Sequence, residues 1–198
     1  MEKSEENKKK KESKLLDTAF TLFTEKGIKN TSIQDIVDQA GVAKGTFYLY
    51  FKDKYEIRDV LICRKAQRLF HDAILALNES YIENFTDQII FVINYVIDEL
   101  TKNPILLQFI SKNLSWGVYN KTINRISDNL EEDGLYALFL KGIQENHIQL
   151  ENPEVTLFMI IELTSSTCFN SVLYKQPLPI KEYKPFLYDT IRSMLKSK

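Results

Sequence analysis

Residues 31–51 read TSIQDIVDQAGVAKGTFYLYF. The first half of this stretch has apolar residues at the spacing of an α-helix, at Ile33, Ile36, Val37 and Ala40. The glycine that follows suits a left-handed turn, because it has no Cβ to clash. The stretch therefore predicts two short helices joined by a tight turn, with the second helix crossing close to the small Ala40.

The flanks of these helices agree with that interpretation. Thr31 or Ser32 can cap the first helix, and Thr31 with Gln34 has the spacing of a capping box. An apolar seam would hold the second of these helices against the helix that ends before Gly27, which is the first of the chain. The seam comprises Val42, Phe47 and Phe51. In a helix-turn-helix of this kind the second helix lies in the major groove of DNA.

Polar groups project from the second helix on the side away from that seam. Lys44 can meet a phosphate or a guanine edge, and Gly45 lets the backbone approach a base pair. Thr46 offers a hydroxyl and a methyl group to a base edge. The hydroxyls of Tyr48 and Tyr50 can donate to phosphates. These residue types favour contact with duplex DNA.

Lys54 begins the next helix and can hold one more phosphate. The spacing alone leaves an alternative open, because a plain helical hairpin with a solvated polar face shows the same pattern.

Composition and charge narrow the class of protein. The chain has 198 residues, 44% hydrophobic and 27% charged, as in an ordinary globular protein. Its net charge of −1 excludes a uniformly basic surface. Residues 1–68 hold 15 Lys and Arg against 11 Asp and Glu, whereas residues 69–198 hold 11 against 16. A basic end of +4 joined to a remainder of −5 suggests that one end meets a polyanion.

Several functional classes are not expected. Cys63 and Cys168 are far apart, which fits a reducing cytosol and excludes a disulfide scaffold. With His71 and His147 as the only histidines, we expect no metal site and no cofactor. The sequence contains no glycine-rich phosphate loop, HExxH or GxSxG motif, so we expect no catalytic residue. The polar start is no signal peptide, and no apolar run approaches the roughly 20 residues of a membrane span. We therefore expect a cytoplasmic protein without a membrane segment.

Helical periodicity runs through nearly the whole chain, and no strand pattern competes with it. Three helix starts are well marked, at Asp53 with Glu56, at Asn103-Pro104 and at Asn152-Pro153. We predict an all-α fold of about nine to ten helices.

Two runs carry a more specific pattern. Residues 16–33 read LDTAFTLFTEKGIKNTSI and residues 40–54 read AGVAKGTFYLYFKDK. Over about residues 12–60 the chain resembles the N-terminal domain of the tetracycline-repressor (TetR) family. The resemblance implies a dimeric all-α bacterial transcriptional regulator, usually a repressor that a small-molecule ligand releases from its double-stranded DNA operator. A regulator or architectural protein without a ligand, or an activator, stays open.

The resemblance also implies an organisation of the chain. Residues 1–12 would be a flexible charged tail, residues 13–54 the DNA-binding domain with the helix-turn-helix at 32–51, and residues 55–78 a connecting helix. Residues 79–198 would bind the ligand and form the homodimer through the last two helices, at about 153–175 and 180–197.

The resemblance carries specific DNA contacts over to this chain. Thr31, Ser32 and Gln34 would lie at the phosphate and groove edge. The recognition helix would present Lys44, Gly45, Thr46, Tyr48 and Tyr50, with Lys54 on the DNA backbone. Tyr50 stands where many members have histidine, so the resemblance does not imply an operator sequence.

A ligand pocket is expected among the C-terminal helices. Glu162 is the single charge in the apolar run 155–169, where a carboxylate needs a partner. The candidate lining residues of the ligand pocket are Phe109, Asn113, Trp116, Tyr119, Phe158, Glu162, Ser165 and Phe169. For each residue taken separately the alternative is favoured, in which the aromatic residues belong to an ordinary core and Glu162 pairs with a neighbouring Lys or Tyr.

Overall fold

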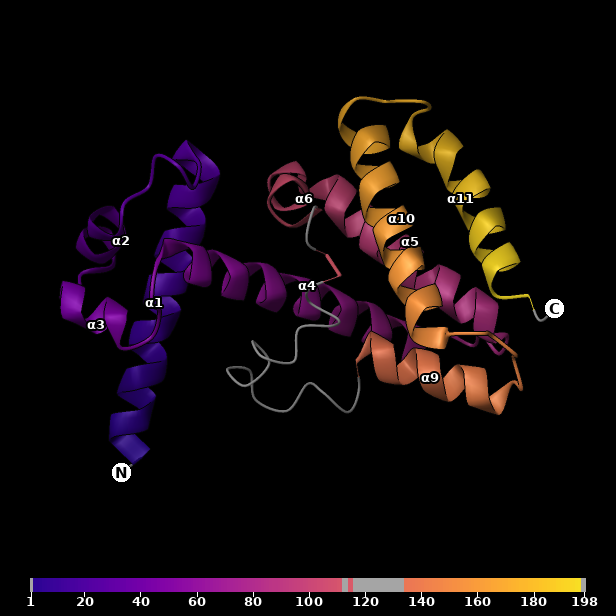
Figure 1. Cartoon of the computed structure of the whole chain (residues 1–198), viewed down its shortest axis with the longest axis horizontal. Helices are drawn as coiled ribbons and strands as arrows, with labels where there is room; N and C mark the ends of the chain where they lie inside the picture. The colour runs from indigo at the N-terminus through magenta and orange to yellow at the C-terminus, as the bar shows by residue number, and fades with distance from the viewer. Residues whose placement is uncertain (1, 112–113, 116–133, 197–198) are drawn as a thin grey trace. The chain divides into compact units, whose positions relative to one another are not determined.

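The computed structural model describes residues 2–111, 114–115 and 134–196, with side chains from residue 6 onward. This part of the chain consists of α-helices and turns, without a strand, which confirms the predicted all-α class (Figure 1). The chain divides into two compact units, Met1–Leu61 and Ile62–Lys198. The division falls inside helix α4 (Lys54–Asn78), within the segment predicted to connect two domains.

Unit 1 contains α1 (Glu2–Lys26), α2 (Ile33–Ala40), α3 (Lys44–Tyr48) and the start of α4. Its apolar stripes meet in a small core whose fully buried members include Leu15, Ala19, Ile36, Phe47 and Ile57. Two glycines in the left-handed region turn the chain between helices, Gly27 with φ 81° and Gly41 with φ 66°. Gly41 confirms the predicted left-handed turn, and Gly27 adopts the same conformation where α1 ends.

Helix α1 begins at Glu2, where a flexible tail over residues 1–12 was expected. Lysine and glutamate are good helix formers, so a charged composition alone does not end a helix. Within this stretch Lys10 pairs with Glu6 one turn away, at 2.7 Å between Nζ and Oε1. The structure therefore makes the basic N-terminal stretch part of the first helix.

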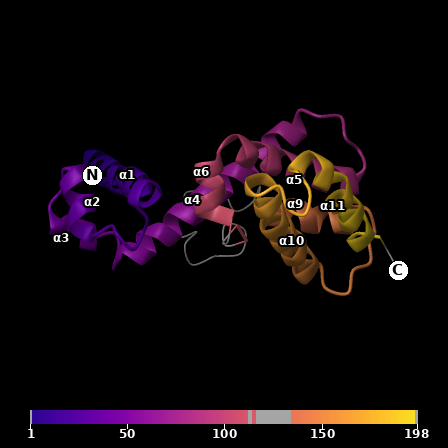
Figure 2. The same ribbon diagram turned by 90° about the horizontal axis from the view of Figure 1, so that it is seen from above.

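Unit 2 contains the rest of α4, then α5 (Phe85–Lys102), α6 (Pro104–Ile110), α9 (Leu135–Glu145), α10 (Pro153–Leu173) and α11 (Ile180–Met194). Helix α10 packs against α5, α6, α9 and α11, as Figure 2 shows from above. Two predicted asparagine caps are confirmed. Asn103 accepts a hydrogen bond from the Leu106 amide and Asn152 accepts one from the Val155 amide, both at 3.0 Å.

A polar cluster joins α5 to α11. The Lys184 ammonium donates to Asn94 Oδ1 at 2.8 Å and also to the Asp98 carboxylate. Tyr188 donates its hydroxyl to the same Asn94 oxygen at 2.6 Å. Burial raises the pKa of the Tyr188 phenol well above its usual range, so the hydroxyl keeps its proton and remains a donor.

Helix α10 is apolar on nearly all sides. The expectation that no apolar run approaches the length of a membrane span was wrong for this helix, whose length and composition alone would allow it to cross a bilayer. However, 39% of its most apolar window is buried inside the protein. Residues such as Leu157, Ile160 and Ile161 lie in the core, as in the core helix of a globular domain. Others, including Val155, Phe158 and Met159, remain about half exposed. A helix apolar on all sides needs apolar partners on more than one side.

Candidate nucleic-acid interface

The start of α2 is fixed by a capping box. Ser32 Oγ accepts a hydrogen bond from the Asp35 amide at 3.1 Å, and Asp35 Oδ2 accepts one from the Ser32 amide at 2.8 Å. Of the two caps left open by the sequence, Ser32 is therefore the one used. The Thr31–Gln34 box is wrong, because Gln34 instead donates to Asp38 Oδ1 at 2.7 Å.

Thr31 has an internal role. Its side chain is only 1% exposed, and its hydroxyl donates to the Gly27 carbonyl at 2.9 Å. It thereby satisfies a carbonyl left over where α1 ends. The expectation that Thr31 lies at the groove edge is contradicted, because a side chain buried in this way cannot reach a phosphate. Ser32 and Gln34 are exposed, as a DNA contact requires.

An ion pair ties α1 to the same capping box. Lys26 Nζ lies 2.8 Å from Asp35 Oδ2. The hydrogen bond from Lys26, together with those from Ser32, lowers the pKa of Asp35 to about 2. Asp35 therefore remains charged under all mild conditions and holds α1 and α2 together.

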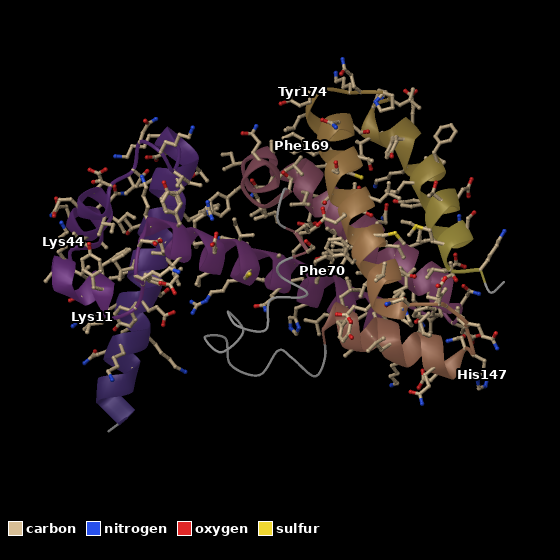
Figure 3. The ribbon with its side chains drawn as sticks, in the orientation of Figure 1. Lys11, Lys44, Phe70, His147, Phe169 and Tyr174 are labelled. Carbon is tan, nitrogen blue, oxygen red and sulfur yellow. The ribbon has the colours of Figure 1, made fainter. Side chains whose placement is uncertain are left out.

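Helix α3 has one buried side and one exposed side. Phe47 and Phe51 are 0% and 2% exposed, and their ring centroids lie 5.7 Å apart. Lys44 and Gly45 are exposed and Tyr48 is 52% exposed. Figure 3 shows Lys44 at the outer edge of this unit. The predicted separation of an apolar seam from a polar face is thus confirmed for these residues.

Gly45 has no structural reason to be glycine. A Cβ built there would meet no described atom within 4 Å, and its φ is not in the left-handed region. Glycine inside a helix costs about 1 kcal/mol relative to alanine. The low helix propensity of glycine therefore destabilises α3 at an exposed position, and no packing contact within the protein explains why a glycine is present there.

Tyr50 is half-buried and lies just after α3. Its hydroxyl donates to the Lys8 carbonyl in α1 at 3.1 Å. This bond uses the proton that we expected to reach a phosphate. It also ties the end of the α3 segment to the basic stretch of α1, residues 8–11, which is four lysines long.

The basic stretch of α1 was missed as a candidate site. The charge run was visible in the sequence, but it was assigned to a flexible tail. Lys8 and Lys11 are exposed, and Figure 3 labels Lys11 on the same unit as Lys44.

Lys54 has an internal role that the sequence did not predict. Its ammonium donates to the carbonyls of Ile28 at 2.9 Å, Lys29 at 3.2 Å and Thr31 at 2.9 Å. These bonds use all its N–H groups, so a phosphate contact would have to replace one of them. Lys54 thus fastens the start of α4 to the turn that precedes α2.

The start of α4 only partly follows the predicted capping box. Asp53 Oδ1 accepts from the Glu56 amide at 2.9 Å, as expected. Glu56 in return accepts from the Lys52 amide at 2.5 Å, one residue before the expected partner.

Of the expected ligand-pocket residues that the structure describes, Ser165 lines a cavity of unit 2. Phe158 is 45% exposed, and neither it nor Phe109, Glu162 and Phe169 is among the lining residues of the two cavities discussed below. Asn113, Trp116 and Tyr119 lie outside the described residues. Because α10 is apolar all round, its sequence could not show which side faces inward.

The described residues contain no cluster of three His, Cys, Asp or Glu that could hold a metal ion.

Comparison with known proteins supports the assignment of unit 1. The family model for bacterial regulatory proteins of the tetR family matches residues 15–61. The Transposon Tn10 TetC protein of Escherichia coli is 30% identical over 161 residues, which cover 76% of this chain and 75% of that protein. The HTH-type transcriptional repressor KstR2 of Rhodococcus jostii is 40% identical over 50 residues, 25% of this chain and 24% of that protein.

Solved structures share the whole fold. The transcriptional regulator FadR from Bacillus subtilis, in complex with stearoyl-CoA, superposes with a TM-score of 0.62 at 22% identity, covering 92% of this chain and 98% of that one. The fatty acid degradation regulator FadR from Bacillus halodurans gives 0.61 at 19% identity, covering 90% and 96%. The match to residues 15–61, together with the relative that aligns over three quarters of its length, shows that the chain belongs to the tetR family of bacterial regulatory proteins.

Proposed function

We propose that the protein is a repressor that binds a double-stranded DNA operator and leaves it when a small molecule binds to unit 2. The observation that carries the DNA-binding part is the two-sided helix α3. A fully buried Phe47 fixes the helix on the core, while Lys44, Gly45 and Tyr48 stay exposed. Exposed basic and hydroxyl groups on a short, rigidly held helix are suited to the major groove.

The proposed DNA contacts follow from exposure. Lys44 and Tyr48 meet phosphates or base edges, and the half-buried Thr46 meets a base edge. Ser32 and Gln34, at the start of α2, meet the phosphate backbone. Thr31 and Lys54 act indirectly, because they hold the turn before α2 in place.

The protein works as a homodimer in this proposal. Half-sites about 34–36 Å apart require two recognition helices related by a two-fold axis. The last two helices expose large apolar side chains, namely Val155, Phe158 and Met159 on α10 and Phe186 on α11. An exposed apolar surface of this kind marks an interaction site. We assign it to the second copy of the chain.

Helix α4 is the element through which a ligand would act. At its first turn Lys54 binds three carbonyls of unit 1. Farther along, Phe70 lines a cavity of unit 2. A ligand changes DNA affinity only through its different affinities for two arrangements of the protein, typically 1–3 kcal/mol of coupling. Such a rearrangement in unit 2 can reach unit 1 along this one helix.

Relatives support a repressor. KstR2 is named a transcriptional repressor, and FadR is a regulator that was crystallised with stearoyl-CoA. An activator or a regulator without a ligand is the alternative. A protein that acts on promoters works in the bacterial cytoplasm, and we assign it neither a catalytic role nor a membrane anchor.

The decisive experiment selects bound fragments from the host genome with the purified protein at low salt. Recovery of a two-fold symmetric sequence supports the proposal, and failure to enrich any sequence contradicts it. Thr46→Ala should relax the preference at particular base pairs of that sequence. An unchanged preference would remove Thr46 from the reading residues. Reporter expression with and without the gene then separates a repressor from an activator.

A further inference from the structure

Unit 2 contains two narrow cavities that adjoin each other inside the apolar core. One lies among α5, α6 and α10, and the other among α4, α5, α9 and α10. Val96, Leu114 and Thr164 line both, so the two share a wall. Each has an open volume of about 10 Å³, close to the space that one water molecule needs. The two cavities therefore lie next to each other, on either side of Val96, Leu114 and Thr164.

The first cavity contains a hydroxyl without a partner. Ser111 caps the C-terminal end of α6 and is only 4% exposed. Its Oγ lacks a hydrogen-bond partner within the part of the chain that the structure describes. A buried hydroxyl in that state destabilises a fold until a partner reaches it. Ser111 is therefore a hydrogen-bonding group kept free at the wall of an apolar cavity.

The other polar groups of the walls are already satisfied or neutral. Thr164 donates to the Ile160 carbonyl at 2.7 Å, and Ser165 donates to the Glu162 carbonyl at 3.2 Å. Burial raises the pKa of the Cys168 thiol to about 12, so it stays uncharged. All remaining lining side chains are apolar. No charged side chain lines either cavity, and Lys184, which acts on the Cys168 thiol, is already paired with Asp98. Burying a charged ligand group here would therefore be costly.

We propose that these cavities bind a neutral, extended aliphatic molecule that carries one hydrogen-bonding group, and that this group pairs with Ser111. The proposal names the ligand class of the response proposed above, and its link to DNA release rests on that function. Because the cavities are narrow, entry of the ligand must part α5, α6 and α10. Packed helices shift between discrete arrangements rather than stretch, so the ligand selects a second arrangement of unit 2.

The test compares n-octanol with octanoate at neutral pH on the full-length protein, by calorimetry and thermal unfolding. The alcohol should bind saturably and raise the Tm, and octanoate should bind at least about tenfold more weakly because its charge must be desolvated. Ser111→Ala should weaken octanol binding about fivefold, the value of one neutral hydrogen bond. Ser193→Ala is the matched control, since that exposed hydroxyl on α11 bonds only its own helix.

A second variant tests the location. Thr164→Leu fills the wall shared by the two cavities and should abolish octanol binding. Absence of saturable octanol binding to the wild type would mean that the cavities hold only water, and would overturn the proposal. Equal binding of octanoate, or unchanged octanol affinity in Ser111→Ala, would overturn it as well.

The DNA readout separates this inference from the proposed function. If octanol binds but the selected operator stays bound, the ligand class stands and the proposed release mechanism fails. If octanol does not bind while another metabolite releases the operator, the function stands and the ligand class is wrong.

Discussion

Gly45 gives the sharpest single-residue test of the DNA interface. Gly45→Ala should raise the stability of the free protein by up to about 1 kcal/mol, because alanine is the better helix former and the added Cβ meets no described atom. The same methyl group would stand between α3 and a base pair, so operator affinity should fall by about 1–3 kcal/mol, the scale of one mismatched base pair. Urea unfolding and gel-shift titration measure the two effects.

The opposite signs of these effects matter. If Gly45 served only the fold, its replacement would lower the stability of the protein, and DNA affinity would fall as a consequence. Unchanged operator affinity in a more stable Gly45→Ala protein would show that nothing approaches the backbone at this position.

Lys44 should contribute to DNA affinity through its positive charge. Lys44→Gln removes one cation from the exposed face of α3 and should reduce the slope of log affinity against log salt by about 0.9, the value for one phosphate contact. Lys181→Gln, an exposed lysine of α11, is the matched control and should leave the slope unchanged. Binding isotherms at several salt concentrations measure both. An identical slope for Lys44→Gln and the wild type would rule out its contact with phosphate.

At the scale of elements, the helical start of α1 places lysines where a tail was expected. Tyr50 holds the Lys8 carbonyl, so this end of the helix is fixed to the segment after α3. The double variant Lys8→Gln/Lys11→Gln changes two exposed lysines of this stretch and should lower the salt slope by up to about 1.8, for two phosphates flanking the half-site. Lys181→Gln/Lys196→Gln carries the same change of charge in unit 2 and controls for net charge. Equal slopes in the two double variants would assign the α1 lysines to solvent.

The capping box of α2 should make the stability of unit 1 depend on pH in the acid range. The pKa of Asp35 is about 2 in the folded chain and 3.8 ordinarily, so the unfolded chain takes up the proton first. The stabilisation is complete above about pH 4 and is lost as the pH falls through about 2. Asp35→Asn should therefore lower the Tm at neutral pH, and the difference from the wild type should shrink toward about pH 2.

Asn152→Ala is the control for that pH dependence. It removes the neutral cap that starts α10 and should cost about 1 kcal/mol at either pH, because an amide side chain does not titrate. A difference between wild type and Asp35→Asn that stays constant from neutral to acid pH would contradict the role assigned to the ion pair with Lys26.

Contacts between residues close in the sequence could be predicted, whereas contacts between residues far apart in the sequence could not. Asn103 and Asn152 cap helices through amides three residues away, so local spacing was sufficient. The turns at Gly27 and Gly41 were likewise set by one residue's freedom to adopt positive φ. Lys54, in contrast, binds carbonyls more than 20 residues away, and no local pattern announces such a bond.

The candidate sites show the same limit. The two-sided character of α3 was predictable, because two phenylalanines one turn apart mark its inner side. On α10 the apolar residues surround the helix, so periodicity could not separate the cavity side from the outer side. Ser165 proved to lie on the inner side and Phe158 on the outer side only when the neighbouring helices were in place.

At the scale of the whole molecule, the outer side of α10 should decide whether the protein forms the dimer that binds a symmetric operator. Phe158→Glu puts a charge on a surface that is 45% exposed in one chain, so unfolding should change by no more than about 0.5 kcal/mol. In the dimer the same charge would be buried without a partner. Loss of a central aromatic contact costs about 2 kcal/mol or more, so the dissociation constant of the dimer should rise by at least about thirtyfold.

Sedimentation equilibrium measures the dimer, and gel shifts measure its consequence for DNA. The variant should bind a full symmetric operator little better than a single half-site, because the two reading helices are no longer linked. Ile105→Glu is the matched control, since Ile105 on α6 is 59% exposed and lies outside the last two helices. If Phe158→Glu stays as dimeric as Ile105→Glu, the second copy does not cover α10. The apolar residues on its outer side would then need another partner.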